Sequence, residues 1–141
     1  MAYLDTSVLD SYYCPEGLSE VVNRALAALD DASISPLVEV ELCALAALKV
    51  RTGEMTRPAA RKVLAQFREH VSGGYYEILD IGPREYEIAG AWLSGFNTAL
   101  RTLDALHLAC AFVHGHALWT SDKPLAQAAA ILGVDCRLIT R

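Results

Sequence analysis

Short runs rich in apolar and β-branched residues alternate along the chain with longer segments of helical periodicity, and this alternation restricts the fold more than any other feature. Consecutive parallel strands need a long crossover connection, usually a helix, so a parallel sheet produces this pattern. The pattern predicts strands over residues 2–4, 33–35, 76–79, 117–120 and 136–139. We therefore expect an α/β sandwich with a parallel central sheet.

The segments between these strands have helical spacing and well-marked ends. Helices are expected over residues 18–29, 36–50, 58–71, 84–97, 103–113 and 124–132. Capping side chains with a proline nearby stand at three of the helix starts, at Ser35, Thr56 and Ser121-Asp122. Glycines stand where helices should end, at Gly53, Gly73, Gly115 and Gly133.

The length of 141 residues and the hydrophobic content of 53% suit one domain, expected to span residues 1–141. The sequence starts without a basic segment followed by an apolar one, and its apolar stretches are too short to span a bilayer. We therefore expect a cytoplasmic protein with no membrane segment. The four cysteines lie far apart without a C-x-x-C pair, which argues against a zinc ribbon. Cys110 with His114 and His116 is a weak zinc candidate.

Two aspartates stand at the expected carboxyl ends of strands, where ligand sites form in open parallel sheets. Asp5 follows the first strand and precedes Thr6 and Ser7, whose hydroxyls can hydrogen-bond to its carboxylate. Asp122 follows the fourth strand and opens a helix. Either aspartate alone is explained equally well as a helix N-cap.

Glu41 lies on an otherwise apolar helix face. At 3.6 residues per turn it shares that face with Leu37, Ala44, Leu45 and Leu48, which should point inward. An ionised carboxylate in such a place is costly unless it meets a cation or several donors. A salt bridge to an arginine and a metal ion are the two explanations left open.

Asp104 lies in the first turn of a helix, on the side that carries Leu108 and is expected to pack inward. The helix dipole favours an acid in any first turn, which gives Asp104 a purely structural explanation. Arg101, three residues before it, could balance the charge. His107, three residues after it, is a residue of the pocket or a packing residue.

Four converging carboxylates would repel one another and stay partly protonated unless a divalent ion neutralised them. Oxygen ligands suit hard cations, so the sequence favours Mg²⁺ or Mn²⁺ over zinc.

Four motifs follow one another along the chain: Leu4-Asp5-Thr6-Ser7-Val8-Leu9, Val40-Glu41-Leu42, Arg101-Thr102-Leu103-Asp104-Ala105-Leu106-His107-Leu108-Ala109 and Thr120-Ser121-Asp122. Together they resemble the PIN-domain ribonucleases of the VapC toxin type, which belong to type II toxin–antitoxin modules. The resemblance extends over essentially the full chain. It implies a Rossmann-like three-layer α/β/α sandwich, a Mg²⁺- or Mn²⁺-dependent endoribonuclease, a homodimer and a small cognate antitoxin.

The resemblance also implies roles for single residues. Asp5 and Asp104 match metal ligands, and Asp122 completes the site directly or through water. Glu41 positions metal-bound water and binds the metal itself either directly or through that water. Thr120 matches a hydroxyl that orders the cluster. Because water is the nucleophile, the RNA products should carry a 5′-phosphate and a 3′-hydroxyl.

The chain has a net charge of −5, but one segment of it is basic. Residues 49–68 contain six basic residues and one acid, so this window carries +5 and the remainder −10. Arg57, Arg61 and Arg68 recur at helical intervals along one stripe. The stripe is either a solvated helix face or a track for the RNA backbone. The helix expected before this stripe carries a second open question. Its leucines are explained by core packing, or as a dimer surface or a groove for an antitoxin helix: Leu37, Leu42, Leu45 and Leu48.

Two other classes of function remain open from the sequence. One is a catalytically silent PIN-like module that binds RNA or a partner and keeps its acids only for folding. The other is a phosphatase or phosphotransfer domain with Asp5 as nucleophile, although Ser7 stands where a second aspartate is usual.

Overall fold

The computed structural model describes residues 1–14 and 19–140, and its strands and helices alternate as expected. The strands are β1 Ala2–Leu4, β2 Ala32–Ile34, β3 Glu77–Ile78, β4 Ala117–Thr120 and β5 Cys136–Leu138. The helices are α1 Thr6–Tyr13, α2 Ser19–Ala27, α3 Pro36–Arg51, α4 Arg57–Ser72, α5 Pro83–Ser94, α6 Thr102–His114 and α7 Lys123–Leu132.

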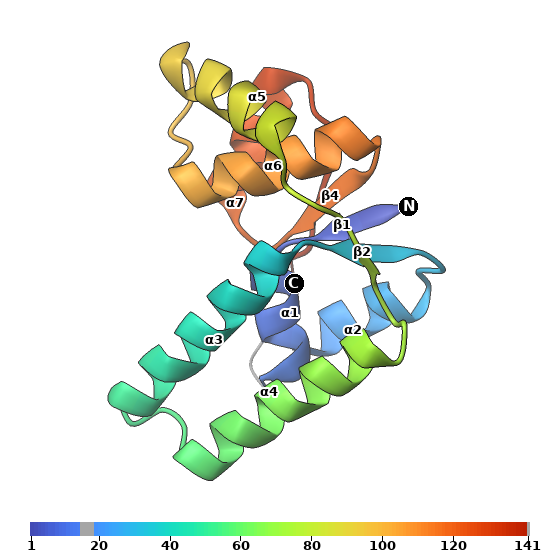
Figure 1. Cartoon of the computed structure of the whole chain (residues 1–141), viewed down its shortest axis with the longest axis vertical. Helices are drawn as coiled ribbons and strands as arrows, with labels where there is room; N and C mark the ends of the chain where they lie inside the picture. Colours follow the sequence, from blue (N-terminus) through green and yellow to red (C-terminus); the bar gives the residue numbers. More distant parts are fainter. Residues whose placement is uncertain (15–18, 141) are drawn as a thin grey trace.

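The strands form one parallel sheet in the order β3-β2-β1-β4-β5, so β1 lies at its centre. The chain runs outward from β1 to β3 and then crosses back to β4 and β5. Since parallel crossovers are right-handed, this reversal places α1 to α4 on one face of the sheet and α5 to α7 on the other (Figure 1). The predicted three-layer α/β/α fold is confirmed.

The reversal of direction lies between β1 and β4, whose carboxyl ends are neighbours in the sheet. Ligand sites of doubly wound α/β folds form at such a point. Leu4 pairs in register with Trp119, so the residues that follow the two strands emerge side by side.

The first helix was not predicted. The chain turns into α1 directly after β1, with Asp5 as N-cap accepting a hydrogen bond from the Val8 N–H at 3.2 Å. Helix α1 has only eight residues, too few for the apolar period to show in the sequence. The expected start of the next helix, Leu18, lies outside the described residues.

The inward face predicted for α3 was wrong. The side chains buried in the core are Val38, Leu42 and Ala46. The neighbouring face with Glu41 and Leu45 lines an open cleft instead. The apolar pattern of α3 extends nearly all round the helix, so it could not reveal which side meets the core.

The core lies on both faces of the sheet around the strand residues Tyr3, Leu4 and Leu118, which are fully buried. All four cysteines, which lie in the described ranges, are free thiols. No helix in the described part of the chain is long and apolar enough to cross a membrane.

The ends of α6 and α7 depend on glycines in the left-handed region, Gly115 with φ 70° and Gly133 with φ 72°. A Cβ added to Gly133 would meet no atom within 4 Å, so any cost of a side chain there comes from the backbone conformation. Gly90 offers a matched control, because it lies exposed inside α5 with equal space around it.

We expect Gly133→Ala to lower the free energy of unfolding by about 1 kcal/mol, since an L-residue is disfavoured in the left-handed region. Gly90→Ala should raise it by about 0.5–1 kcal/mol, because alanine restricts the unfolded chain and favours the helix. Urea unfolding of both variants measures the two changes. Equal stabilisation by both would contradict the left-handed end of α7.

Candidate functional site

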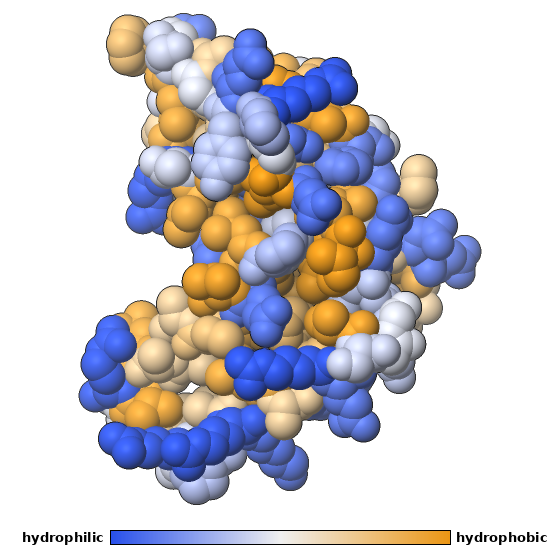
Figure 2. Space-filling view, in the orientation of Figure 1, coloured by the Kyte–Doolittle hydropathy of each residue, from blue (hydrophilic) through white to orange (hydrophobic). Residues whose placement is uncertain are grey.

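A cleft of about 550 Å³ opens at the carboxyl ends of β1 and β4, between α3 and the start of α6. Figure 2 shows the surface hollowed between these two helices, with apolar side chains along its rim. Five carboxylates line the cleft: Asp5, Asp10, Glu41, Asp104 and Asp122. The structure thus brings the four acids singled out in the sequence, which are distant along the chain, into one hollow.

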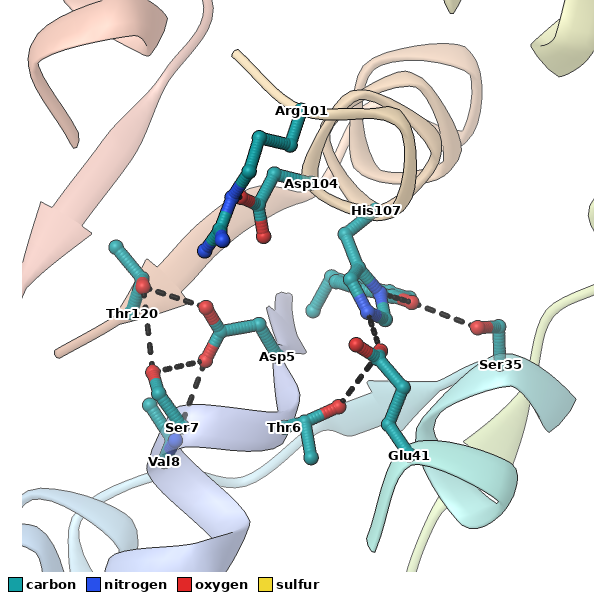
Figure 3. A network of polar contacts seen from close by, with 11 residues as sticks. Asp5, Thr6, Ser7, Val8, Ser35, Glu41, Arg101, Asp104, His107 and Thr120 are labelled. Carbon is teal, nitrogen blue, oxygen red and sulfur yellow. Dashed lines mark hydrogen bonds and ion pairs between the residues drawn. The ribbon is translucent and has the colours of Figure 1, made fainter. Parts of the chain in front are cut away.

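Asp5 is 4% exposed, and its carboxylate is held on both oxygens. Oδ1 accepts hydrogen bonds from the Ser7 hydroxyl at 2.6 Å and the Val8 N–H at 3.2 Å, and Oδ2 accepts one from the Thr120 hydroxyl (Figure 3). Burial raises the pKa of Asp5 above its ordinary value, although these hydrogen bonds act in the opposite direction. The protein therefore fixes this carboxylate in place while leaving its charge incompletely compensated.

Asp104 and Asp122 complete the acidic side of the cleft. Burial and the nearby charge of Asp122 raise the pKa of Asp104, while Arg101 acts to lower it through a long contact of 3.9 Å. Asp122 is the N-cap residue of α7, yet within the described chain its side chain makes no capping hydrogen bond. Its backbone N–H donates instead to the Thr120 hydroxyl at 3.0 Å, which ties it to Asp5.

Glu41 extends from α3 toward the same cleft, and its side chain is 22% exposed. Its partner is not the arginine considered in the sequence but His107, whose Nε2 contacts Oε1. The Thr6 hydroxyl donates to the same oxygen at 2.9 Å. Burial alone would raise the pKa of Glu41, but the hydrogen bonds from His107 and Thr6 lower it.

Few cations lie near this group of acids. Arg101 is 86% exposed at the rim, and Arg51 also lines the cleft. Lys49 pairs with Asp10 at 2.7 Å, so the fifth carboxylate is neutralised. The other four face one another with one long arginine contact and one histidine contact between them.

The donor chemistry of the cleft fits a hard divalent cation, because its ligands are carboxylate oxygens. As placed, no three histidine, cysteine, aspartate or glutamate side chains among residues 1–14 and 19–140 lie close enough together to hold a metal. The same holds for the zinc candidate of Cys110, His114 and His116, which the structure does not gather into a metal site. A cation in the cleft would therefore have to draw Asp104 and Asp122 toward Asp5.

The sequence profile of the family described as "PIN domain" matches residues 2–131. This chain belongs to the PIN-domain family. None of the curated protein sequences matches it significantly.

Solved structures with the same PIN fold have low sequence identity to this chain. FitAcB from Neisseria gonorrhoeae is 21% identical with a TM-score of 0.72, and the match covers 96% of each chain. VapC20 of Mycobacterium tuberculosis, described as a sarcin-ricin loop cleaving toxin, is 18% identical with a TM-score of 0.71, over 91% of this chain and 95% of that one. VapBC2 from Rickettsia felis, bound to a promoter DNA fragment, is 16% identical with a TM-score of 0.70, over 99% and 100%.

The arginine stripe of this PIN domain lies on α4, beside the cleft but outside it. Arg57 and Arg61 line an apolar groove between α3 and α4. Arg68 pairs with Glu39 at 3.5 Å, so part of its charge is compensated. Arg51, which was not singled out from the sequence, lines both the groove and the cleft and so joins the two.

Without divalent ions, we expect Asp104→Asn to raise the free energy of unfolding. Because the folded protein holds the Asp104 proton to higher pH than the unfolded chain, the contribution of Asp104 to wild-type stability falls as the pH rises from about 4 toward neutral. The advantage of the variant should therefore grow over this range, as urea unfolding at several pH values can measure. The control is Asp31→Asn at an exposed position outside the cleft. A variant less stable than wild type at neutral pH would show that the carboxylate is not under strain.

Proposed function

We propose that this PIN domain is a divalent-metal-dependent endoribonuclease and the toxin of a type II toxin–antitoxin module. The observation that carries the proposal is the convergence of Asp5, Glu41, Asp104 and Asp122 in one cleft with too few cations to balance them. A structural salt-bridge cluster would pair its acids with arginines or lysines, as Asp10 is paired with Lys49. Four carboxylates with a single long arginine contact between them indicate a site that takes its positive charge from outside.

In this proposal Asp5, Asp104 and Asp122 hold Mg²⁺ or Mn²⁺. The ion would act as a Lewis acid, stabilising negative charge on the phosphate and lowering the pKa of a water molecule bound to it. Ser7 and Thr120 keep the Asp5 carboxylate in a fixed orientation through their hydrogen bonds. Glu41, lying across the cleft on α3, orients the water that attacks the phosphodiester and takes up its proton.

RNA would reach the cleft along α3 and α4. Arg51 lies at the cleft itself, and Arg57 and Arg61 continue the positive charge along the groove. Their guanidinium groups suit phosphate oxygens and would offset the repulsion between RNA and the acids. Arg68 would contribute less, because Glu39 already binds it.

The proposed partners are a cognate antitoxin and a second copy of the chain, in the cytoplasm. An antitoxin partner is supported by the fold of this chain, which it shares with chains of toxin–antitoxin complexes such as VapBC2 from Rickettsia felis. Exposed apolar side chains around a pocket of α3 and α5, among them Val40 and Tyr86, support a protein-binding surface that suits a homodimer.

A phosphotransfer role is disfavoured by the surroundings of Asp5. Phosphotransfer through Asp5 would need a general acid beside the nucleophile, whereas the groups that form hydrogen bonds with this carboxylate are two hydroxyls and a backbone N–H. Ser7, at the position of the usual second acid, donates one of these hydrogen bonds and cannot act as general acid in the way an aspartic acid does. Incubation with beryllium fluoride should therefore leave no adduct on Asp5.

Purified protein should cleave structured RNA with Mg²⁺ or Mn²⁺ and stop when EDTA is added. Asp5→Asn and Asp104→Asn should each abolish cleavage while circular dichroism shows a folded protein, because each removes a ligand charge. Asp31→Asn should cleave like wild type, and single- and double-stranded DNA test for a deoxyribonuclease. A folded wild type that binds RNA but never cleaves it would make the chain a silent binding module.

Replacing Arg57 and Arg61 by alanine should weaken RNA binding and flatten its salt dependence, by about 0.7 in the log–log slope for each phosphate that is no longer bound. Adding Arg68→Ala should change the slope little, since that side chain is paired with Glu39. Arg24→Ala on α2, which pairs with Glu20 at an exposed site, is the control. Filter-binding titrations of a catalytically inactive variant at several salt concentrations measure the slope. An unchanged slope would make the arginine stripe an ordinary solvated surface.

A further inference from the structure

The function proposed above does not explain one feature of the site. A series of buried, hydrogen-bonded side chains leads through the core to Glu41: Ser35, Tyr3 and His107. We propose that His107 is a positioning residue that fixes the Glu41 carboxylate at the cleft, with Tyr3 and Ser35 as its supports. The inference rests on the proposed function, and it assigns a role to three residues to which that function gives none.

The chain of contacts runs from the core to the cleft. His107 is 2% exposed, and its Nε2 contacts Oε1 of Glu41 (Figure 3). On the other side of the ring, Nδ1 lies 2.6 Å from the Tyr3 hydroxyl. The Tyr3 hydroxyl lies 2.7 Å from the hydroxyl of Ser35, and both residues are fully buried.

The direction of these hydrogen bonds follows from the carboxylate at the end. Ionised Glu41 only accepts, so Nε2 of His107 must carry a proton. A neutral imidazole that donates from Nε2 accepts at Nδ1, and the Tyr3 hydroxyl is the donor placed there. Ser35 can then donate to the Tyr3 oxygen. In this relay of Ser35, Tyr3 and His107, both hydroxyls and both ring nitrogens have partners, which fixes the orientation of the imidazole ring.

The relay acts on one oxygen of Glu41 and leaves the other available. Both His107 and Thr6 bind Oε1, and no other side chain in the described ranges donates to Oε2. Glu41 lies on the face of α3 that lines the cleft, not on the face buried in the core. Packing alone therefore does not hold its side chain in place. Anchoring Oε1 from α1 and α6 leaves Oε2 to face a water or ion in the cleft.

The residues of the relay come from separate parts of the fold, β1, α3 with its N-cap, and α6. Ser35 is the N-cap residue of α3, yet its hydroxyl contacts Tyr3 rather than capping the helix among the described residues. An N-cap serine usually bonds to the backbone of its helix. The contact of Ser35 with Tyr3 instead indicates that this hydroxyl supports the relay rather than the start of α3. Hydrogen-bond partners behind metal-site groups typically change affinity or activity by about 10- to 100-fold when removed.

The test compares His107→Leu and Tyr3→Phe with matched controls elsewhere in the core. His116→Leu removes another buried histidine, which contacts Ser33 at 2.8 Å and does not line the cleft. Tyr76→Phe removes another buried tyrosine hydroxyl, 2.6 Å from that of Tyr13. His107→Gln restores an N–H donor on a chain of different shape and is the rescue variant.

We expect His107→Leu to lower kcat for RNA cleavage with Mn²⁺ by about 10- to 100-fold while KM stays near wild type. Tyr3→Phe should act in the same direction more weakly, His107→Gln should recover part of the loss, and both controls should leave kcat unchanged. Because His107 acts through Glu41, adding His107→Leu to Glu41→Gln should cause no further loss. Additive losses in the double variant, or a wild-type kcat in His107→Leu, would overturn the proposal.

A structural measurement separates this inference from the proposed nuclease function. Crystal structures of wild type and His107→Leu should show the Glu41 carboxylate displaced only in the variant, whether or not the protein cleaves RNA. Isothermal titration with Mn²⁺ alone reports separately on the metal site. Wild-type protein without Mn²⁺ binding or cleavage would refute the proposed function, whereas an unmoved Glu41 in His107→Leu would refute the positioning role.

Discussion

The hydrogen-bonded carboxylate of Asp5 is the interaction on which the site depends. It joins the end of β1, the first turn of α1 and the end of β4, because Ser7, Val8 and Thr120 all donate to it. A parallel sheet brings the ends of β1 and β4 together, and the buried carboxylate converts that adjacency into a fixed geometry. Thr120 passes the constraint on to Asp122 by accepting its backbone N–H.

The remaining acids reach Asp5 from helices on opposite sides of the sheet, Glu41 on α3 and Asp104 on α6. Their environments differ in a way that suits different tasks. Burial and the charge of Asp122 raise the pKa of Asp104, whereas His107 and Thr6 lower that of Glu41. The cleft thus combines one carboxylate anchored in its charged form with others whose charged form is disfavoured by burial.

Much of this arrangement was predictable from the sequence, because strand ends and carboxylates leave local signals. The bounds of β1 and β4 were predicted without error, and the motifs around Asp5 and Asp104 led to the PIN fold that the family match confirms. That Asp5 and Asp104 bind a metal remains a prediction. Helix α1 was missed because eight residues are too short to show a period. The relay of His107 and Tyr3 could not be found, since a contact between residues 104 positions apart leaves no pattern in one sequence.

The proposed function depends on the acids of the cleft gathering around a divalent cation. Anomalous diffraction from crystals grown with Mn²⁺ tests this most directly, because the ion is located without reference to activity. We predict a manganese peak in the cleft, with Asp104 and Asp122 drawn toward Asp5 to reach ligand distances of about 2.0–2.2 Å. A cleft without a peak at saturating Mn²⁺, with its carboxylates unmoved, would contradict the claim.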